Sequence, residues 1–414
     1  PLIVIITAFS NLFGSGGAPL FSIERGKNNP QKAETIMNTS YSMVCACAVV
    51  LMVIGFLFAH PLLTLFGASA DAMVYAYPYM MIYLIGTLPS MVATGMNPFI
   101  NAQGYATTGM FSVAIGAVAN LILDPVFIFV FGLGIRGAAI ATVLSQILSA
   151  TFVLYFLRKK TELTVRLLSL EEIRGCWNRA KNIISLGTAC RENAKNIVSL
   201  GTAGFIMQLT NSLVTICCNN VLSVTGGDLY ISVMTIVSSI RQIIDTPIHA
   251  ITEGSSPVIS YNYGARRPKR VFQSWLTMSV MAILYTLLAW GVILFAPRFL
   301  IGIFSSDQTL ITDAIPALKL YFGAFVFQTL QYVGQTMFKS LGKKKFAIFF
   351  SLLRKVIIVV PLTYILPYLF HMGSDGVFLA EPVSNVLGGS ACFIVMLCTV
   401  MPELKRMAKE NSDR

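Results

Sequence analysis

The sequence repeats itself at a fixed interval of 238 residues. Many pairs of identical residues keep this interval, among them Pro19/Pro257, Ser22/Ser260, Gly26/Gly264, Pro30/Pro268, Phe66/Phe304, Pro78/Pro316, Tyr83/Tyr321 and Gly104/Gly342. Toward the end the interval becomes 239, at Gly137/Gly376 and Ala141/Ala380. A register kept over so long a stretch indicates that one bundle of elements was duplicated. In membranes, internal repeats are typical of transporters, whose binding sites lie where the repeats meet.

The composition places this duplicated chain in a membrane. Hydrophobic residues make up 55% of the chain and charged residues 12%, and the mean hydropathy is +0.72. Soluble domains carry about 25% charged residues. The net charge of +12 follows from cytoplasmic loops rich in Lys and Arg, so we expect no nucleic-acid partner. The eight cysteines show no metal-ligand spacing, and we interpret them as small buried hydrophobic residues.

Long apolar runs predict the membrane-spanning helices, each of which needs about 20 mostly apolar residues. Eleven such runs occur, at 1–23, 38–59, 77–100, 108–131, 137–157, 197–222, 229–261, 271–295, 314–338, 346–369 and 376–400. The run at 229–261 is predicted to break at Gly254 and Pro257, and its counterpart at Gly16 and Pro19. Subtracting 238 from 197–222 gives positions before residue 1, so the first helix of the first copy is expected to be missing.

The predicted fold is therefore an all-α membrane protein of two six-helix lobes. We expect the following division: a first lobe over 1–157 with five of its six helices, a linker over 158–196, a second lobe over 197–400 and a tail over 401–414. Loops rich in Lys and Arg alternate with loops that hold few, so the positive-inside rule assigns the linker and the tail to the cytoplasm. The expected location is the plasma (inner) membrane, with several passes through the lipid bilayer.

Four stretches of the sequence resemble the multidrug and toxic compound extrusion (MATE) family. They are Asn97-Pro98-Phe99-Ile100-Asn101-Ala102-Gln103-Gly104, Asn120-Leu121-Ile122-Leu123-Asp124-Pro125, Gly137-Ala138-Ala139-Ile140-Ala141-Thr142 and Pro257-Val258-Ile259-Ser260-Tyr261-Asn262-Tyr263-Gly264-Ala265. The similarity extends over essentially the whole chain. It implies a secondary antiporter that expels organic, often cationic, compounds in exchange for Na⁺ or H⁺.

A carboxylate inside a predicted span, Asp124, is the first candidate for an ion site. A charge within a span is costly and is a functional hypothesis by default. Asn120 lies on the same helix face, and Thr142 enters the next span at a similar depth, so three oxygen-bearing side chains reach one level. Oxygen ligands suit a hard cation such as Na⁺, and the resemblance implies that these residues bind the coupling ion. The alternative is that Asp124 caps a kink at Pro125, and the two roles are compatible.

Three further residues are candidates for the substrate cavity. Glu381 lies 239 residues after Thr142 and so occupies the mirror position in the second lobe; the alternative is a carboxylate near the outer interface, accessible to water. Glu253 lies beside the predicted helix break, where it could attract cations. Asn97 belongs to a helix whose polar residues, by resemblance to the family, border the cavity.

The remaining charges within the spans are interpreted as structural. Arg241 and Asp245 are four residues apart and are expected to neutralise each other on one helix face. Arg354 and Lys355 are expected to reach the cytoplasmic interface, and Lys319 the outer one, because long basic side chains extend toward water.

The sequence thus predicts a monomeric efflux antiporter that exports small-molecule drugs or organic cations by alternating access. It is not expected to be an enzyme or to hold a cofactor besides the coupling ion, and no phosphate-binding loop for ATP occurs in the sequence. One alternative is a lipid-linked oligosaccharide flippase, which needs a strongly cationic cavity that only Arg241, Lys319, Arg354 and Lys355 could supply. A membrane-embedded enzyme or receptor is a more remote alternative, because no paired His/Asp catalytic set accompanies the repeats.

Overall fold

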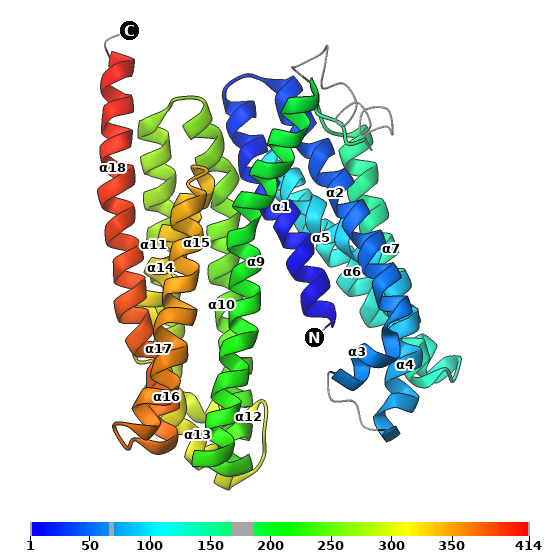
Figure 1. The fold of residues 1–414 in the computed structure, drawn as a ribbon, viewed down its shortest axis with the longest axis vertical. Helices are drawn as coiled ribbons and strands as arrows, with labels where there is room; N and C mark the ends of the chain where they lie inside the picture. Colours follow the sequence, from blue (N-terminus) through cyan, green and yellow to red (C-terminus); the bar gives the residue numbers. More distant parts are fainter. Residues whose placement is uncertain (1, 66–69, 167–185, 413–414) are drawn as a thin grey trace. The chain divides into compact units, whose positions relative to one another are not determined.

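The computed structural model describes residues 2–65, 70–166 and 186–412, and the secondary structure of these residues is helical. The chain divides into two compact units, Pro1–Phe205 (unit 1) and Ile206–Arg414 (unit 2). Helix α9, Leu186–Thr225, contributes its first half to unit 1 and its second half to unit 2. Figure 1 shows the helices of each unit in sequence colours.

Unit 1 is a bundle of long helices joined by short turns. Its helices are α1 Leu2–Gly26, α2 Pro30–Leu57, α3 Ala59–Leu65, α4 Ala70–Ile85, α5 Thr87–Ala102, α6 Ala106–Pro125, the π-helical segment η1 Val126–Val130, and α7 Gly134–Lys159. Helix α2 begins where the Asn29 side chain accepts a hydrogen bond from the Lys32 amide, with Pro30 in the first turn, a strong helix start. The core packs α1 against α2 and α5, with fully buried Phe21 and Phe99 in edge contact.

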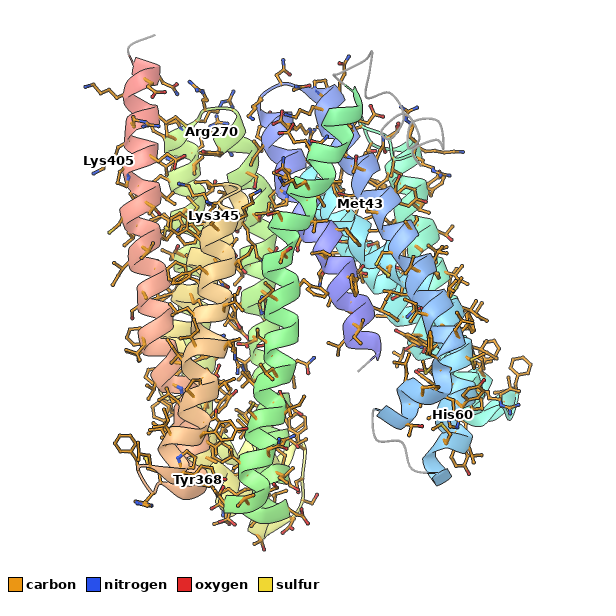
Figure 2. The ribbon with its side chains drawn as sticks, in the orientation of Figure 1. Met43, His60, Arg270, Lys345, Tyr368 and Lys405 are labelled. Atoms are coloured by element: carbon orange, nitrogen blue, oxygen red, sulfur yellow. The ribbon has the colours of Figure 1, made fainter. Side chains whose placement is uncertain are left out.

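Unit 2 repeats this plan. Its helices are α10 Gly227–Gly264, α11 Pro268–Phe295, α12 Pro297–Gly302, α13 Gln308–Tyr321, α14 Phe325–Ser340, α15 Lys344–Leu352, the π-helical η2 Leu353–Val359, α16 Val360–Tyr368, α17 Gly373–Ser384, the π-helical η3 Asn385–Gly389, and α18 Ser390–Ser412. Basic residues Arg270, Lys345 and Lys405 lie at one end of the unit and Tyr368 at the other (Figure 2). The positive-inside rule assigns the basic end to the cytoplasm.

The sequence repeat is visible in the boundaries of the helices. Helices α2 and α11 begin at Pro30 and Pro268, and α5 and α14, like α6 and α15, also begin 238 residues apart. The turns repeat as well, because Gly104 has φ +95° and Gly342 has φ +71°. Glycine adopts this left-handed conformation without the steric cost that a Cβ atom adds. The duplication therefore preserved backbone geometry as well as residue identity.

Eleven membrane-spanning helices were predicted, and the residues that the structure describes contain fewer helices that are long and apolar enough to cross a membrane. Seven helices of the described chain are long and apolar enough to cross a membrane, and the count rises to nine if each bent pair is one span. The bent pairs are α4 with α5, at 54°, and α13 with α14, at 49°. Helices α9 and α10 are not among the nine. The predicted count of eleven is not confirmed, and the expected additional helix of the first lobe stays a prediction.

The predicted helix breaks were wrong. Helix α1 is continuous through Gly16 and Pro19, and α10 is continuous through Gly254 and Pro257. Gly16 instead allows α1 to pack closely against α9, because a Cβ atom at this position would lie 2.3 Å from the Ile197 carbonyl oxygen. The bends occur between α4 and α5 and between α13 and α14.

The predicted linker, 158–196, falls partly outside the described residues. Its first residues end α7 and its last residues begin α9, and residues 167–185 are not described. The predicted limits of the lobes therefore stay predictions.

Candidate functional site

The three residues predicted to bind the coupling ion lie together in unit 1. The Asn120 side-chain nitrogen Nδ2 donates to Asp124 Oδ1 at 3.1 Å and lies 3.5 Å from Thr142 Oγ1. Asn120 and Asp124 are one turn apart on α6, and Thr142 comes from α7, which packs against α6. Thr142 also donates to the Ala138 carbonyl at 2.9 Å. The structure thus joins an amide, a carboxylate and a hydroxyl, and their role in ion coupling stays a prediction.

The helix changes its winding next to Asp124. Pro125 ends the regular part of α6, and the π-helical segment η1 follows directly. Proline lacks the amide hydrogen and its ring crowds the carbonyl of the preceding turn, which favours such a widened turn. Single π turns inside α-helices are frequent at functional sites. The half-buried Asp124 is therefore placed at a local irregularity, which suits both the ion-site hypothesis and the kink-cap alternative.

Asn97 connects two helices of unit 1. Its Nδ2 lies 2.8 Å from the Gly109 carbonyl oxygen and 2.6 Å from Ser112 Oγ, both on α6. Its side-chain oxygen Oδ1 accepts a hydrogen bond from Asn101 Nδ2 at 3.2 Å. These contacts tie α5 to α6, and a role of Asn97 at a substrate cavity stays a prediction.

Glu253 has a basic partner. Its carboxylate lies 3.0 Å from the Lys339 ammonium of α14, and its side chain is 45% exposed. The break at Gly254 on which the cavity prediction rested does not occur. Attraction of cations by Glu253 stays a prediction, although its charge is already paired with Lys339.

Glu381 lies at the centre of a buried cluster of charges in unit 2. The Glu381 oxygen Oε1 is 2.8 Å from Arg241 Nη2, 3.0 Å from Arg354 Nη1 and 3.0 Å from Lys355 Nζ. The Glu381 side chain is 3% exposed, so the alternative of a carboxylate open to water at the outer interface is wrong. The predicted mirror position of Thr142 is thus occupied in unit 2 by a carboxylate that three cations share.

Arg354 and Lys355 do not extend to the membrane interface, and that prediction was wrong. Both side chains are almost fully buried, and Arg354 also donates to Asn385 Oδ1 at 2.6 Å. Lys355 lies about 16 Å from Lys344, the first residue of α15, at 1.5 Å per residue. The Glu381 carboxylate pairs with Lys355 at this depth. Lys319, by contrast, is exposed.

Arg241 joins the Glu381 cluster to a second carboxylate. As predicted, it pairs with Asp245 on the same helix, at 3.2 Å from Nε to Oδ2. Asp245 also accepts hydrogen bonds from Gln328 Nε2 at 3.0 and 3.2 Å and from the Tyr332 hydroxyl at 3.3 Å. Arg241 additionally donates to the Tyr321 hydroxyl. The sequence predicted the pair of Arg241 and Asp245 but not the cluster around Glu381. The signal for the cluster was the Arg354-Lys355 dipeptide in one apolar run and Glu381 in the next.

A cavity of about 430 Å³ opens onto this cluster. Four charged side chains line it, Arg241, Asp245, Lys355 and Glu381, together with polar groups of α9 and α10. Its size lies within the usual range of small-molecule sites. Among the residues that the structure describes, no group of three or more His, Cys, Asp and Glu side chains could hold a metal ion.

Comparisons with known proteins agree on one family. The MatE family profile matches residues 1–126 and 204–365. A multidrug export protein MepA of Staphylococcus saprophyticus is 22% identical over 399 residues, 96% of this chain and 83% of that protein. An FAD transporter of Shewanella oneidensis is 24% identical over 401 residues, 95% of this chain and 84% of that protein.

Solved structures show the same fold. A MATE crystal structure in the bent conformation superposes with a TM-score of 0.87 at 21% identity, covering 100% of this chain and 87% of that one. A MOP superfamily transporter from Pyrococcus furiosus, described as having a binding pocket of reverse polarity, superposes with a TM-score of 0.85 at 22% identity, covering 99% and 87%. The chain therefore belongs to the MatE family of multidrug efflux transporters, which are multi-pass membrane proteins and not enzymes.

Proposed function

We propose that this chain exports organic compounds in exchange for Na⁺ or H⁺ and that the coupling ion binds at Asn120, Asp124 and Thr142 in unit 1. The observation that carries the proposal is the contact between these side chains, with a carboxylate hydrogen-bonded to Asn120 inside an apolar helix. An ionisable group in such a helix is costly and is retained where it serves a pathway or a proton relay.

The arrangement suits either ion in a different way. Asp124 and Thr142 present oxygen atoms, which are the ligands of hard cations. The Asn120 amide currently turns its nitrogen toward both, and a half-turn of this amide would present its oxygen to Na⁺ instead. For H⁺, the carboxylate alone suffices, and protonation of Asp124 would weaken its hydrogen bond from Asn120 because a neutral acceptor binds less strongly.

Alternating access would couple the ion to the exported compound. It requires only that ion and compound favour different conformations of the protein, so that each lowers the affinity for the other. The names of the relatives, a multidrug export protein and an FAD transporter, support organic compounds as cargo. The flippase alternative is less favoured, because neither of these two relatives is named as a flippase.

Ethidium efflux from proteoliposomes tests this function. The protein would be reconstituted and given an inward Na⁺ gradient at equal pH, and then an inward pH gradient without Na⁺. We expect one gradient to drive efflux and an ionophore that collapses that gradient to stop it. Vesicles without protein are the control. Efflux that is equally fast with and without either gradient would contradict secondary active export.

A further inference from the structure

We propose that the cavity in unit 2 binds the anionic group of an organic compound, with Arg241 and Lys355 as its cationic partners. Both residues line the cavity. The Arg241 side chain is 15% exposed and the Lys355 side chain 4% exposed, so both are largely shielded from water. This inference rests on the proposed export function. Among the organic compounds that the protein exports, it assigns to this cavity those that carry a phosphate, carboxylate or sulfonate group.

The balance of charge at the cavity favours an anion. The cluster holds three basic side chains, those of Arg241, Arg354 and Lys355, against two carboxylates, those of Asp245 and Glu381. The excess positive charge lies in a buried setting, where it is poorly screened and attracts a negative group strongly.

The carboxylates of the cavity are already engaged by donors. Asp245 accepts hydrogen bonds from Arg241, Gln328 and Tyr332. Glu381 Oε1 accepts from three cations. A cationic compound would have to displace these donors before it could pair with either carboxylate. An anionic compound meets the donors directly, and Arg and Lys side chains are the usual partners of phosphate and carboxylate groups.

Arg354 explains how Glu381 can release the other two cations. It is not among the residues that line the cavity, and it contacts both Glu381 and Asn385. Its Nε is buried and has no hydrogen-bond partner among the described residues. When the anion of a ligand reaches Arg241 and Lys355, Glu381 remains paired with Arg354. Glu381 thus acts as a counter-ion that positions Arg241 and Lys355 and competes with the anion of a ligand for them.

Aromatic rings around the cavity indicate the other part of the ligand. Tyr321 and Tyr332 line it, and the His249 ring lies 4.5 Å from that of Tyr332. The Arg241 guanidinium lies 5.6 Å from the centre of the Tyr321 ring. Rings of this kind stack on planar organic groups. The expected ligand is a planar aromatic body with a negatively charged substituent.

Equilibrium binding of flavin mononucleotide and riboflavin tests the inference, because the two fluorescent molecules differ by one phosphate group. Fluorescence anisotropy would be measured with the purified chain in an uncharged detergent. A second pair, 4-methylumbelliferyl phosphate and 4-methylumbelliferone, repeats the comparison. Two charge-assisted contacts predict that the phosphate form binds tighter by roughly tenfold or more. If neither phosphate binds better than its neutral partner, the inference is wrong.

Variants connect this preference to the named residues. Arg241→Gln and Lys355→Gln should each reduce the preference for the phosphate form, whereas Lys319→Gln, which removes an exposed charge of the same unit, should keep it. Glu381→Gln should raise the affinity for flavin mononucleotide, because the competing anion is lost. A preference that survives in both Gln variants would contradict the inference. If these variants fail to fold, Arg241→Lys and Lys355→Arg take their place, and both should keep the preference for the phosphate form. Loss of the preference in both variants would contradict the inference.

Two competitors identify the source of the anionic group. Excess phosphatidylglycerol that displaces flavin mononucleotide, where phosphatidylcholine does not, would support the anion site and assign it to a lipid headgroup. Displacement by neither lipid would support it as a site for soluble organic anions. The binding assay uses no ion gradient, so it is independent of the efflux assay. Absence of gradient-driven efflux would contradict the proposed function without changing the measured preference for the phosphate form.

Discussion

Arg241 and Glu381 lie on different helices of unit 2, and Arg241 Nη2 meets Glu381 Oε1 at 2.8 Å. Arg241 comes from α10 and Glu381 from α17, and their side chains are 15% and 3% exposed. The same carboxylate oxygen also accepts from Arg354 and Lys355. Glu381 therefore stabilises a buried cluster of cations that would otherwise repel one another. Replacing Glu381 should therefore destabilise the protein more than replacing any one of the three cations.

The interaction between Lys355 and Glu381 should appear as non-additive stability. Glu381→Gln leaves three cations without their shared carboxylate, and breaking a buried pair costs about 3–5 kcal/mol. Lys355→Gln combined with Glu381→Gln should cost less than the two single changes together, because each change removes part of the penalty of the other. Thermal unfolding midpoints of the detergent-solubilised protein would show this. Strictly additive shifts would mean that the two side chains do not interact.

Gly16 and Gly254 provide a matched pair within long helices of the two repeats. A Cβ atom at Gly16 would lie 2.3 Å from the Ile197 carbonyl oxygen, whereas one at Gly254 would meet no atom within 4 Å. Gly16→Ala should therefore destabilise the protein by about 1–3 kcal/mol through overpacking. Gly254→Ala should be neutral or stabilise it by up to about 1 kcal/mol, because alanine favours the helix. Thermal unfolding distinguishes the two, and equal effects would show that α1 does not pack closely on α9.

Much of the fold follows from the spacing of residues, because repeats and apolar runs are local features of the sequence. The same holds for Asn120, Asp124 and Thr142: two are one turn apart on one helix, and the depth of the third follows from counting residues into the next helix. Their meeting required only that consecutive helices pack together.

The charge cluster of unit 2 could not be predicted in this way. Its members come from α10, η2 and α17, and which faces of these helices meet is decided by packing of the whole unit. Distance from a helix end suggested that Arg354 and Lys355 reach water, but a buried carboxylate partner outweighs that tendency. The bend between α13 and α14 was missed for a similar reason, since Gly254 and Pro257 were stronger local signals than the residues at which the chain turns.

Thr142→Ala distinguishes the two coupling ions. If Na⁺ is the ion, loss of the Thr142 hydroxyl removes one oxygen ligand and should raise the Na⁺ concentration needed for half-maximal ethidium efflux. Thr142→Ser keeps the hydroxyl and is the matched control. If H⁺ is the ion, the carboxylate of Asp124 carries it and the effect of Thr142→Ala should be small. An unchanged Na⁺ response in a protein shown to be driven by Na⁺ would exclude Thr142 from the site.

Ethidium transport by Asp124→Asn, measured in two modes in the same proteoliposomes, tests ion coupling most directly. Asparagine keeps the size of the side chain but can neither ionise nor carry a proton. Efflux driven by an imposed Na⁺ or pH gradient should be lost, while exchange of labelled for unlabelled ethidium without a gradient should persist. Asp228→Asn, at an exposed position, should leave both modes unchanged. Gradient-driven efflux by Asp124→Asn at the wild-type rate would contradict the assignment of the coupling site to unit 1.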